Sequence, residues 1–284
     1  MGFYALAVSE LASSWRKRIT VVPALEDLHR RIAREFADLL EAKAQKNQIL
    51  TVIAPVGPLN YLYFAEEAAR RGLGCENLRT INMDEYLGED GGLIPMSHPL
   101  SFRRFMEETL FSRLDPAKRP PPEQIIFPDP ECPERITELI DHIGGADVCW
   151  AGFGITGHMA FNDPPAMLEE PDDLESFRNS KTRAIAISPM STAQMLMGGT
   201  DGNYGILPAR AVTIGMYELL KSKKMHLTFM RSWHSGLWRR ALLGPVTQQF
   251  PGSLVQEHPN VEITMTELAA RPPVVNTFQA VGGE

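Results

Sequence analysis

Hydrophobic residues recur with two different periods along this chain, and segments of the two kinds alternate. Residues 25–44 place Leu28, Ile32 and Phe36 four positions apart with charged residues between them, a spacing typical of an amphipathic helix. Residues 48–54 (QILTVIA) form instead a short β-branched run, which is typical of a buried strand. The pattern therefore predicts a helix followed directly by a strand.

The same alternation continues toward the C-terminus. Further strands are predicted at residues 78–83, 124–127, 147–152, 182–188, 225–230 and 261–265. Helices are predicted at residues 59–71, 101–114, 134–144 and 232–243, with a short helix at 253–258 and a strand that changes into a helix at 211–220. Strands separated by helices indicate βαβ units. We therefore predict an α/β fold, Rossmann-like, with a mostly parallel central sheet flanked by helices on both faces.

No Gly/Ser-rich or Pro-rich linker interrupts this pattern, so we expect one domain over residues 1–284. Pro- and Gly-rich composition predicts a loosely ordered tail after about residue 271. Ligands of open α/β sheets bind beyond the carboxyl ends of the strands. The site is therefore expected where the strands end near Ala54, Met83 and Gly152.

Composition and charge narrow the function. The chain is 44% hydrophobic and 22% charged, as globular proteins are, and its net charge of −7 without a dense Lys/Arg tract argues against nucleic acid or anionic membrane as partners. No signal-like N-terminus and no run of about 18 apolar residues is visible, which favours a cytoplasmic protein. Three scattered cysteines predict neither a disulfide framework nor a zinc site.

Two adjacent carboxylates, Asp84 and Glu85, follow the strand that ends near Met83. Carboxylates at such a position can lie in different environments, and one of them can be desolvated, with the raised pKa that a general base requires. A helix N-cap or a surface turn is the alternative. On these residues alone both interpretations stay open.

A glycine-rich turn follows the strand that ends near Gly152. The segment GFGITGHMAFNDP contains Gly154 and Gly157, which permit close approach to a ligand, and His158, which can carry a proton near neutral pH. Asp163 is a candidate to orient this histidine. A lone histidine in a turn is more often structural, so this segment by itself is a weak signal.

Taken together, the segments are more specific. INMDEY, then HPLSF, then GFGITGHMAFNDP resemble, in that order, the glucosamine-6-phosphate deaminase/isomerase family, and the resemblance extends from roughly residue 25 to residue 267. The related 6-phosphogluconolactonases share the family's fold but usually lack the NMDEY and AFN sequence motifs. The resemblance therefore indicates the deaminase/isomerase branch.

The resemblance implies specific roles. Asp84 matches the family aspartate that moves a proton between two sugar carbons through an enediol or enolamine, and His158 matches the histidine that assists ring opening, with Glu85 and Asp163 as further catalytic candidates. This chemistry requires no metal and no redox cofactor. A small-molecule sugar or sugar phosphate is the implied partner, and a homo-oligomer is implied as a possible assembly. The substrate-binding candidates are Gly57, Gly154, Thr156, Gly157, Asn162, Arg231 and His234.

The chain departs from the family beside the histidine. Thr156 stands where the family has an aspartate, and Asp163 stands where it has a glutamate. A threonine cannot accept the charge of an imidazolium as a carboxylate does, and Asp163 is one methylene shorter than the glutamate. We therefore expect a weaker or differently tuned proton carrier at His158.

The phosphate-binding side departs further. Residues 54–58 read APVGP, where the family loop is rich in Gly, Ser and Thr, and its two prolines remove two N–H donors. Thr192 and His234 align with a family arginine and lysine, while Arg231 and Arg183 are possible replacement cations. An unphosphorylated or differently charged sugar, a lactonase activity and a non-catalytic sugar-binding or regulatory homologue therefore remain as alternatives.

Overall fold

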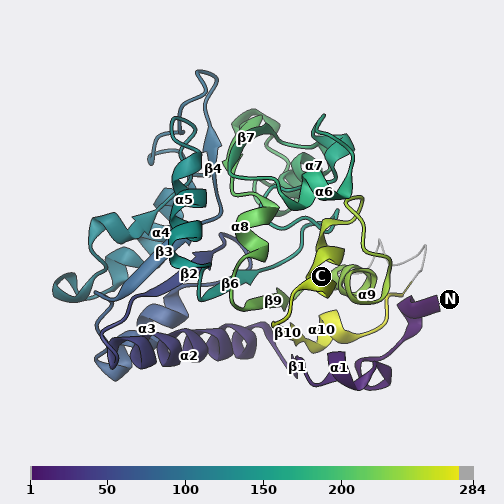
Figure 1. Cartoon of the computed structure of the whole chain (residues 1–284), viewed down its shortest axis with the longest axis horizontal. Helices are drawn as coiled ribbons and strands as arrows, with labels where there is room; N and C mark the ends of the chain where they lie inside the picture. The colour runs from purple at the N-terminus through teal and green to yellow at the C-terminus, as the bar shows by residue number, and fades with distance from the viewer. Residues whose placement is uncertain (1, 275–284) are drawn as a thin grey trace.

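A seven-stranded sheet, parallel throughout, forms the centre of the molecule (Figure 1). The structure is a computed structural model that describes residues 2–274. The strand order is β1-β10-β9-β6-β2-β3-β5, and every neighbouring pair is parallel. The strands are β1 Ile19–Val22, β2 Leu50–Ala54, β3 Leu78–Asn82, β5 Ile125–Ile126, β6 Val148–Ala151, β9 Met225–Phe229 and β10 Val261–Thr266. The predicted α/β class with a mostly parallel sheet is confirmed.

Helices cover both faces of this sheet. Successive strand residues point to opposite faces, so Val52 lies in one hydrophobic cluster with Phe36, and Ile53 lies in another with Ile140 and Trp238. Residues of helices α2 and α3 belong to the first cluster, and residues of α5, α8 and α9 belong to the second. The α-helices are α1 Ser13–Arg16, α2 Leu25–Ala44, α3 Leu62–Arg71, α4 Phe102–Thr109, α5 Glu134–Ile143, α6 Leu174–Arg178, α7 Pro189–Gly198, α8 Met216–Leu220, α9 His234–Leu243 and α10 Glu267–Ala270.

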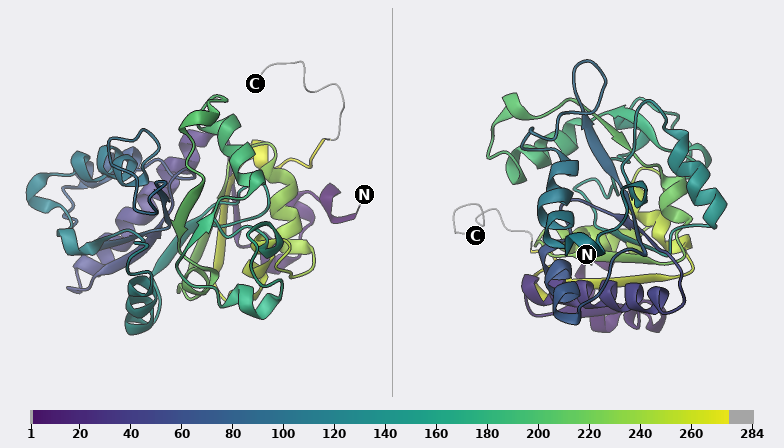
Figure 2. Two further views of the ribbon diagram at one scale, coloured as in Figure 1. Left: turned by 90° about the horizontal axis from the view of Figure 1, so that it is seen from above. Right: turned by 90° about the vertical axis from the view of Figure 1, so that its left-hand side faces the viewer.

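A second sheet, which the sequence did not predict, has the order β4-β8-β7 and is antiparallel. Its strands are β4 Asp84–Leu87, β8 Arg210–Thr213 and β7 Arg183–Ala186. A single residue, Met83, separates β4 from β3, and the strand predicted at residues 182–188 corresponds to β7, which lies at an edge of this second sheet. Figure 1 and the right-hand view of Figure 2 show α2 and this second sheet at opposite ends of the molecule.

Other differences from the predictions are local. Residues 253–257 of the segment predicted at 253–258 lie in a 3-10 helix, Pro251–Glu257, and α6 lies in a stretch where no helix was predicted. The expectation of a loose tail falls mainly on residues 275–284, which lie outside the described residues, and the single-domain expectation stays a prediction. Within residues 2–274, none of the helices combines the length and the apolar character needed to cross a membrane.

Candidate active site

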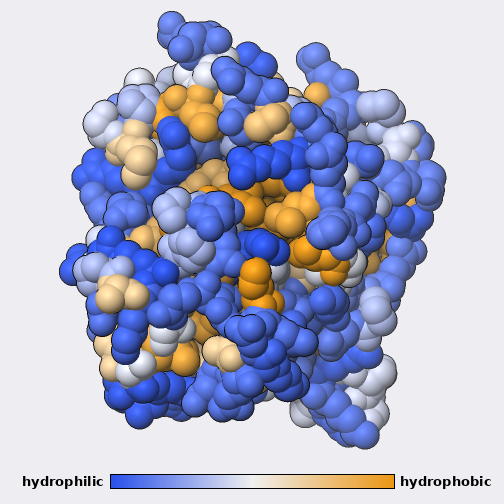
Figure 3. Space-filling view, turned by 60° about the vertical axis from the view of Figure 1, so that its left-hand side comes forward, coloured by the Kyte–Doolittle hydropathy of each residue, from blue (hydrophilic) through white to orange (hydrophobic). Residues whose placement is uncertain are grey.

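A cavity of about 220 Å³ opens where four strands of the main sheet end. It is lined by the loop after β2, by Met83 and Asp84 after β3, by the glycine turn after β6, and by Arg231 after β9. This is the position expected from the strand ends near Ala54, Met83 and Gly152. Phenylalanine, methionine and proline side chains make up much of the lining, and apolar side chains gather in a hollow of the molecular surface (Figure 3).

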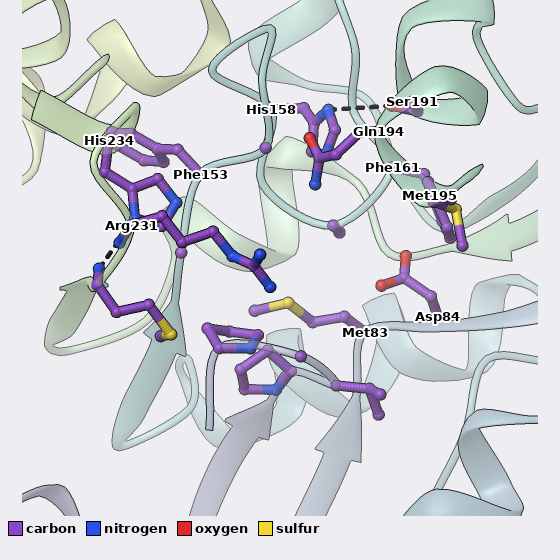
Figure 4. A pocket seen from close by; sticks show the side chains of 18 of the residues that line it. Met83, Asp84, Phe153, His158, Phe161, Ser191, Gln194, Met195, Arg231 and His234 are labelled. Atoms are coloured by element: carbon purple, nitrogen blue, oxygen red, sulfur yellow. Dashed lines mark hydrogen bonds between the residues drawn. The ribbon is translucent and has the colours of Figure 1, made fainter. Parts of the chain in front are cut away.

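Asp84 is the first residue of β4, and its carboxylate points into this cavity (Figure 4). Only 8% of the residue is exposed. Burial raises the pKa of Asp84 to about 7, while a 2.5 Å hydrogen bond from the Thr213 hydroxyl to Oδ1 and the nearby His158 act in the opposite direction. A carboxyl group with this pKa exchanges protons near neutral pH, as a general base must.

His158 lies in the turn after β6, and its imidazole ring is hydrogen-bonded to Asp163. Nδ1 of the ring is 2.9 Å from Oδ1 of Asp163. The Thr156 hydroxyl donates to the same oxygen at 2.6 Å, and the Ser191 hydroxyl donates to Oδ2 at 2.7 Å. Burial by itself would raise the pKa of Asp163, but the imidazole and the two hydroxyl donors lower it to about 2. Asp163 is therefore an anion that orients the histidine ring.

The geometry supplies a carboxylate partner for His158, while the expectation of a weaker or differently tuned proton carrier stays a prediction. Asp163 reaches the ring despite its missing methylene, so the carboxylate partner is present. Thr156 does not replace that carboxylate but donates a hydrogen bond to it. With Nδ1 on Asp163, Nε2 is the free ring nitrogen, and it lies over Gly154, where a Cβ atom would come within 1.9 Å of it. Glycine at 154 thus makes room for the Nε2 edge of the imidazole.

Glu85 was predicted as a catalytic candidate, and the structure places it elsewhere. The residue is fully buried, and its carboxylate accepts hydrogen bonds from the Ser101 hydroxyl and from the Phe102 and Arg103 amides. The Arg103 guanidinium lies 3.1 Å from Oε2. Glu85 therefore caps the N-terminus of α4 and does not line the cavity.

The predicted substrate-binding residues separate into two groups. Gly57, Gly154, Arg231 and His234 line the cavity, whereas Thr156, Gly157 and Asn162 do not. Asn162 instead donates to the carbonyls of Met159 and Ile214 and accepts from Arg183. A Cβ atom on Gly157 would meet Phe250. These three residues support the turn that carries His158 rather than face a ligand.

The cationic groups near the cavity differ from those expected. Within residues 2–274, Arg231 is the lone arginine or lysine that lines it, and its guanidinium has no ion-pair or hydrogen-bond partner there. Arg183 pairs with Glu170 and does not line the cavity. Nδ1 of His234 accepts two amide N–H groups, and burial, with the nearby Arg231 charge, lowers the pKa of His234 to about 4. His234 is therefore uncharged at neutral pH.

Several lining residues were not anticipated. Ser191, Gln194 and Met195 come from α7, and Trp233 precedes α9. The Gln194 carboxamide oxygen accepts the Ile155 amide at 2.6 Å, and the side chain lies beside His158 (Figure 4). The segment that forms α7, PMSTAQMLMG, has no charged residue and no clear polar stripe, so the pattern gave no helix signal there.

One cluster outside the cavity has metal-ligand character. Ligand atoms of Glu35, His226 and Glu262 lie within 4.8 Å of one another. The Lys224 ammonium is 2.9 Å from Glu35 and 2.9 Å from Glu262. The lysine already supplies the positive charge that a metal ion would bring, so we read this cluster as an ion-pair network.

Comparison with known proteins supports the resemblance. Glucosamine-6-phosphate deaminase 2 of Giardia intestinalis is 28% identical over 273 residues, covering 93% of this chain and 95% of that protein. Glucosamine-6-phosphate deaminase 2 of Bacillus subtilis (strain 168) is 28% identical over 265 residues, covering 89% and 96%. No family model matches the chain. The identities are low, but the alignments span nearly the whole length of both relatives.

Solved structures share the fold. A monomeric glucosamine-6-phosphate deaminase superposes with a TM-score of 0.75 at 21% identity, covering 89% of this chain and 98% of that one. A 6-phosphogluconolactonase from Thermotoga maritima superposes with a TM-score of 0.61 at 16% identity, covering 88% and 99%. At these identities the likeness establishes the common fold. Since one of these neighbours is described as monomeric, the expected homo-oligomer stays a prediction, as does the cytoplasmic location.

Proposed function

We propose that this chain, as a divergent member of the glucosamine-6-phosphate deaminase/isomerase family, isomerises or deaminates a sugar or amino sugar. The observation that carries the proposal is the placement of Asp84 and His158 in one cavity at the carboxyl ends of the parallel strands. A base near a carbon-bound proton and a proton carrier at the ring oxygen are the two groups that isomerisation next to a carbonyl needs.

Each group has a defined step. His158 gives a proton through Nε2 to the ring oxygen as the sugar opens and takes the proton of the C1 hydroxyl, so that C1 becomes the aldehyde, while Asp163 stabilises the protonated imidazole through Nδ1. Ionised Asp84 then takes the proton from C2, the electron pair left behind forms the C1–C2 double bond, and protonated His158 gives a proton to the C1 oxygen, which yields an enediol or, with an amino group at C2, an enolamine. Asp84 returns its proton to C1, and in the isomerase case the C2 hydroxyl proton passes back to His158 as the ketone forms. In the amino-sugar case the resulting imine is hydrolysed and ammonia is released.

The acid limb of the pH profile tests this assignment. Because the base must be ionised and burial raises its pKa to about 7, kcat/KM should fall about tenfold per pH unit below pH 7. The measurement is kcat/KM between pH 5 and 9 in the isomerase or deaminase assay. An acid limb centred near pH 4, the range of an ordinary carboxyl group, would contradict Asp84 as the base.

The polar groups of the cavity favour a sugar of lower charge than the family substrate, with the 6-phosphate compound as the alternative. The loop after β2 has two prolines without N–H groups, and His234 is uncharged near neutral pH because its pKa is about 4. Arg231 is left as the cationic group that faces the cavity. A lone guanidinium can bind one phosphate or carboxylate through two parallel N–H···O bonds, but its single positive charge balances only part of the charge of a fully ionised phosphate monoester.

Replacing Arg231 with methionine should raise KM for an anionic substrate about 10- to 100-fold and change KM little for a neutral one. Arg231→Lys keeps the charge but not the fork of N–H donors, and it is the matched control. Its KM for the anionic substrate should lie between those of the wild type and Arg231→Met. Steady-state kinetics on a paired neutral and anionic sugar measures this. An equal change for both sugars would exclude Arg231 as the anion contact.

A further inference from the structure

Thr213, which no sequence motif singled out, is the hydrogen-bonding partner of Asp84. The two residues lie directly opposite each other in the antiparallel β4–β8 pair. Directly opposed residues project from the same face of a sheet with Cβ atoms about 4.5–5.5 Å apart. Thr213 is fully buried, and its hydroxyl lies 2.5 Å from Oδ1 of Asp84. Strand register therefore brings the hydroxyl to the carboxylate.

The direction of this hydrogen bond is set by a third group. The amide of Phe161 donates to Oγ1 of Thr213 at 3.1 Å. The hydroxyl's own proton then has two acceptors, Oδ1 of Asp84 and the Ile214 carbonyl at 3.3 Å. The closer and charged acceptor is favoured. Thr213 thus accepts from the Phe161 amide and donates to Asp84.

We infer that Thr213 is a positioning residue that occupies Oδ1 of Asp84 and leaves Oδ2 as the oxygen that takes and returns the substrate's carbon-bound proton. The inference rests on the proposed function. Within the described part of the chain, the Thr213 hydroxyl is the one donor with good hydrogen-bond geometry to the Asp84 carboxylate. The Phe161 amide, which donates to Thr213, also lies close enough to help lower the pKa of Asp84, and the carboxylate faces the cavity (Figure 4). One oxygen is fixed and the other is open to substrate.

The same hydroxyl connects the two motifs of the site. Asp84 belongs to NMDEY, and Phe161 belongs to GHMAFN, three residues after His158. Through Oγ1 of Thr213, the strand that carries the carbon base is bonded to the turn that carries the ring-opening histidine. Losing the hydroxyl should therefore loosen the alignment of the two groups as well as remove a hydrogen bond to the ionised carboxylate.

Thr213→Val, which keeps the shape and removes the hydroxyl, is the test. Its first readout does not depend on turnover: the pKa of Asp84 is measured from carboxyl ¹³C shifts in aspartate-labelled protein, with the signal assigned by Asp84→Asn. Because the lost bond favours the ionised form, the pKa should rise by about one to two units above that of the wild type. The acid limb of kcat/KM should move by the same amount, and kcat should fall more than KM changes.

Two variants serve as controls. Thr213→Ser keeps the donor and should restore both the pKa and the acid limb. Thr228→Val removes another fully buried strand hydroxyl, one that bonds the Ala151 carbonyl, and should leave the Asp84 pKa unchanged. If Thr213→Val does not fold, Thr213→Cys, a weak donor of similar size, takes its place and should shift the pKa in the same direction.

The outcomes separate this inference from the proposed function. An unchanged Asp84 pKa in Thr213→Val or Thr213→Cys, in a protein whose activity is lost in Asp84→Asn, overturns the role of Thr213 alone. Full activity in Asp84→Asn overturns the proposed function whatever the pKa of the wild type. A raised pKa that Thr213→Ser reverses, together with the matching shift of the acid limb, supports both.

Discussion

Replacing Asp84 with asparagine is expected to lower kcat/KM by about 10²–10⁴-fold, the usual contribution of a general base. Asparagine has nearly the same shape and its carboxamide oxygen can still accept the Thr213 hydroxyl, but it cannot take a proton. The loss should therefore appear in kcat with little change in KM. Steady-state kinetics at pH 8, where wild-type Asp84 is ionised, measures it most clearly.

The same variant makes an independent prediction for stability. The folded-state pKa of Asp84, about 7, is above its unfolded value near 3.8, so the folded protein binds this proton more tightly. The contribution of Asp84 is most favourable below about pH 4 and is lost as pH rises through 7. Asp84→Asn lacks that loss, so its melting temperature should exceed that of the wild type at pH 8, and the gap should close toward pH 4.

Glu85→Gln is the matched control because it changes the adjacent carboxylate. Glu85 caps α4 and does not line the cavity, so this variant should lose stability, by about 1–3 kcal/mol, and keep the acid limb near pH 7.

Equal activity of Asp84→Asn and the wild type would instead favour a lactonase, in which His158 positions water and no carbon-bound proton is moved.

Replacing Asp163 with asparagine is expected to lower kcat/KM for ring-forming sugars by about 10²–10⁴-fold. The asparagine amide cannot stabilise a protonated imidazole, and its NH₂ group cannot accept the hydroxyl donors that Asp163 now accepts. The test uses a second substrate, an aldose too short to cyclise. The Asp163→Asn penalty should largely vanish on that aldose, whereas Asp84→Asn should be impaired on both.

Asp163 also predicts an acid sensitivity of the fold. Its folded pKa, about 2, is below the unfolded value near 3.8, so its stabilising contribution is present above about pH 4 and is lost as pH falls toward 2. Asp163→Asn should lack this loss, and Asp163→Glu, which keeps a carboxylate, should recover part of both activity and stability. An equal penalty on the cyclising and non-cyclising aldoses would exclude a ring-opening role for this pair.

Much of the fold could be predicted because the hydrophobic pattern was regular. Helix α2 begins and ends at the predicted residues, and the buried runs at 50–54 and 225–229 form central parallel strands. The second sheet was missed because only Met83 separates β4 from β3 and all four residues of β4 are buried, which leaves no alternation to detect. Helix α7 was missed because it has no charged residue.

Within the site, the sequence motifs identified Asp84 and His158, but they could not show which of the two adjacent carboxylates, Asp84 or Glu85, faces the cavity. The two side chains differ in direction because β4 is a strand, in which successive side chains point to opposite faces. Asp84 therefore points toward the cavity and Glu85 toward α4. The reach of Asp163 could not be judged from side-chain length, because Ala160, at φ 54°, bends the backbone between it and the histidine. Thr213 is far in sequence and is brought in by register.

The central claim, that Asp84 moves a carbon-bound proton, is tested most directly by NMR in deuterated water. The panel contains sugars, amino sugars and their 6-phosphates, with Asp84→Asn as the control protein. We predict deuterium at C2, or product formation, for at least one compound with the wild type and neither with the variant. A compound that binds the wild type while no member of the panel exchanges its C2 proton would contradict the account and identify a sugar-binding homologue without turnover.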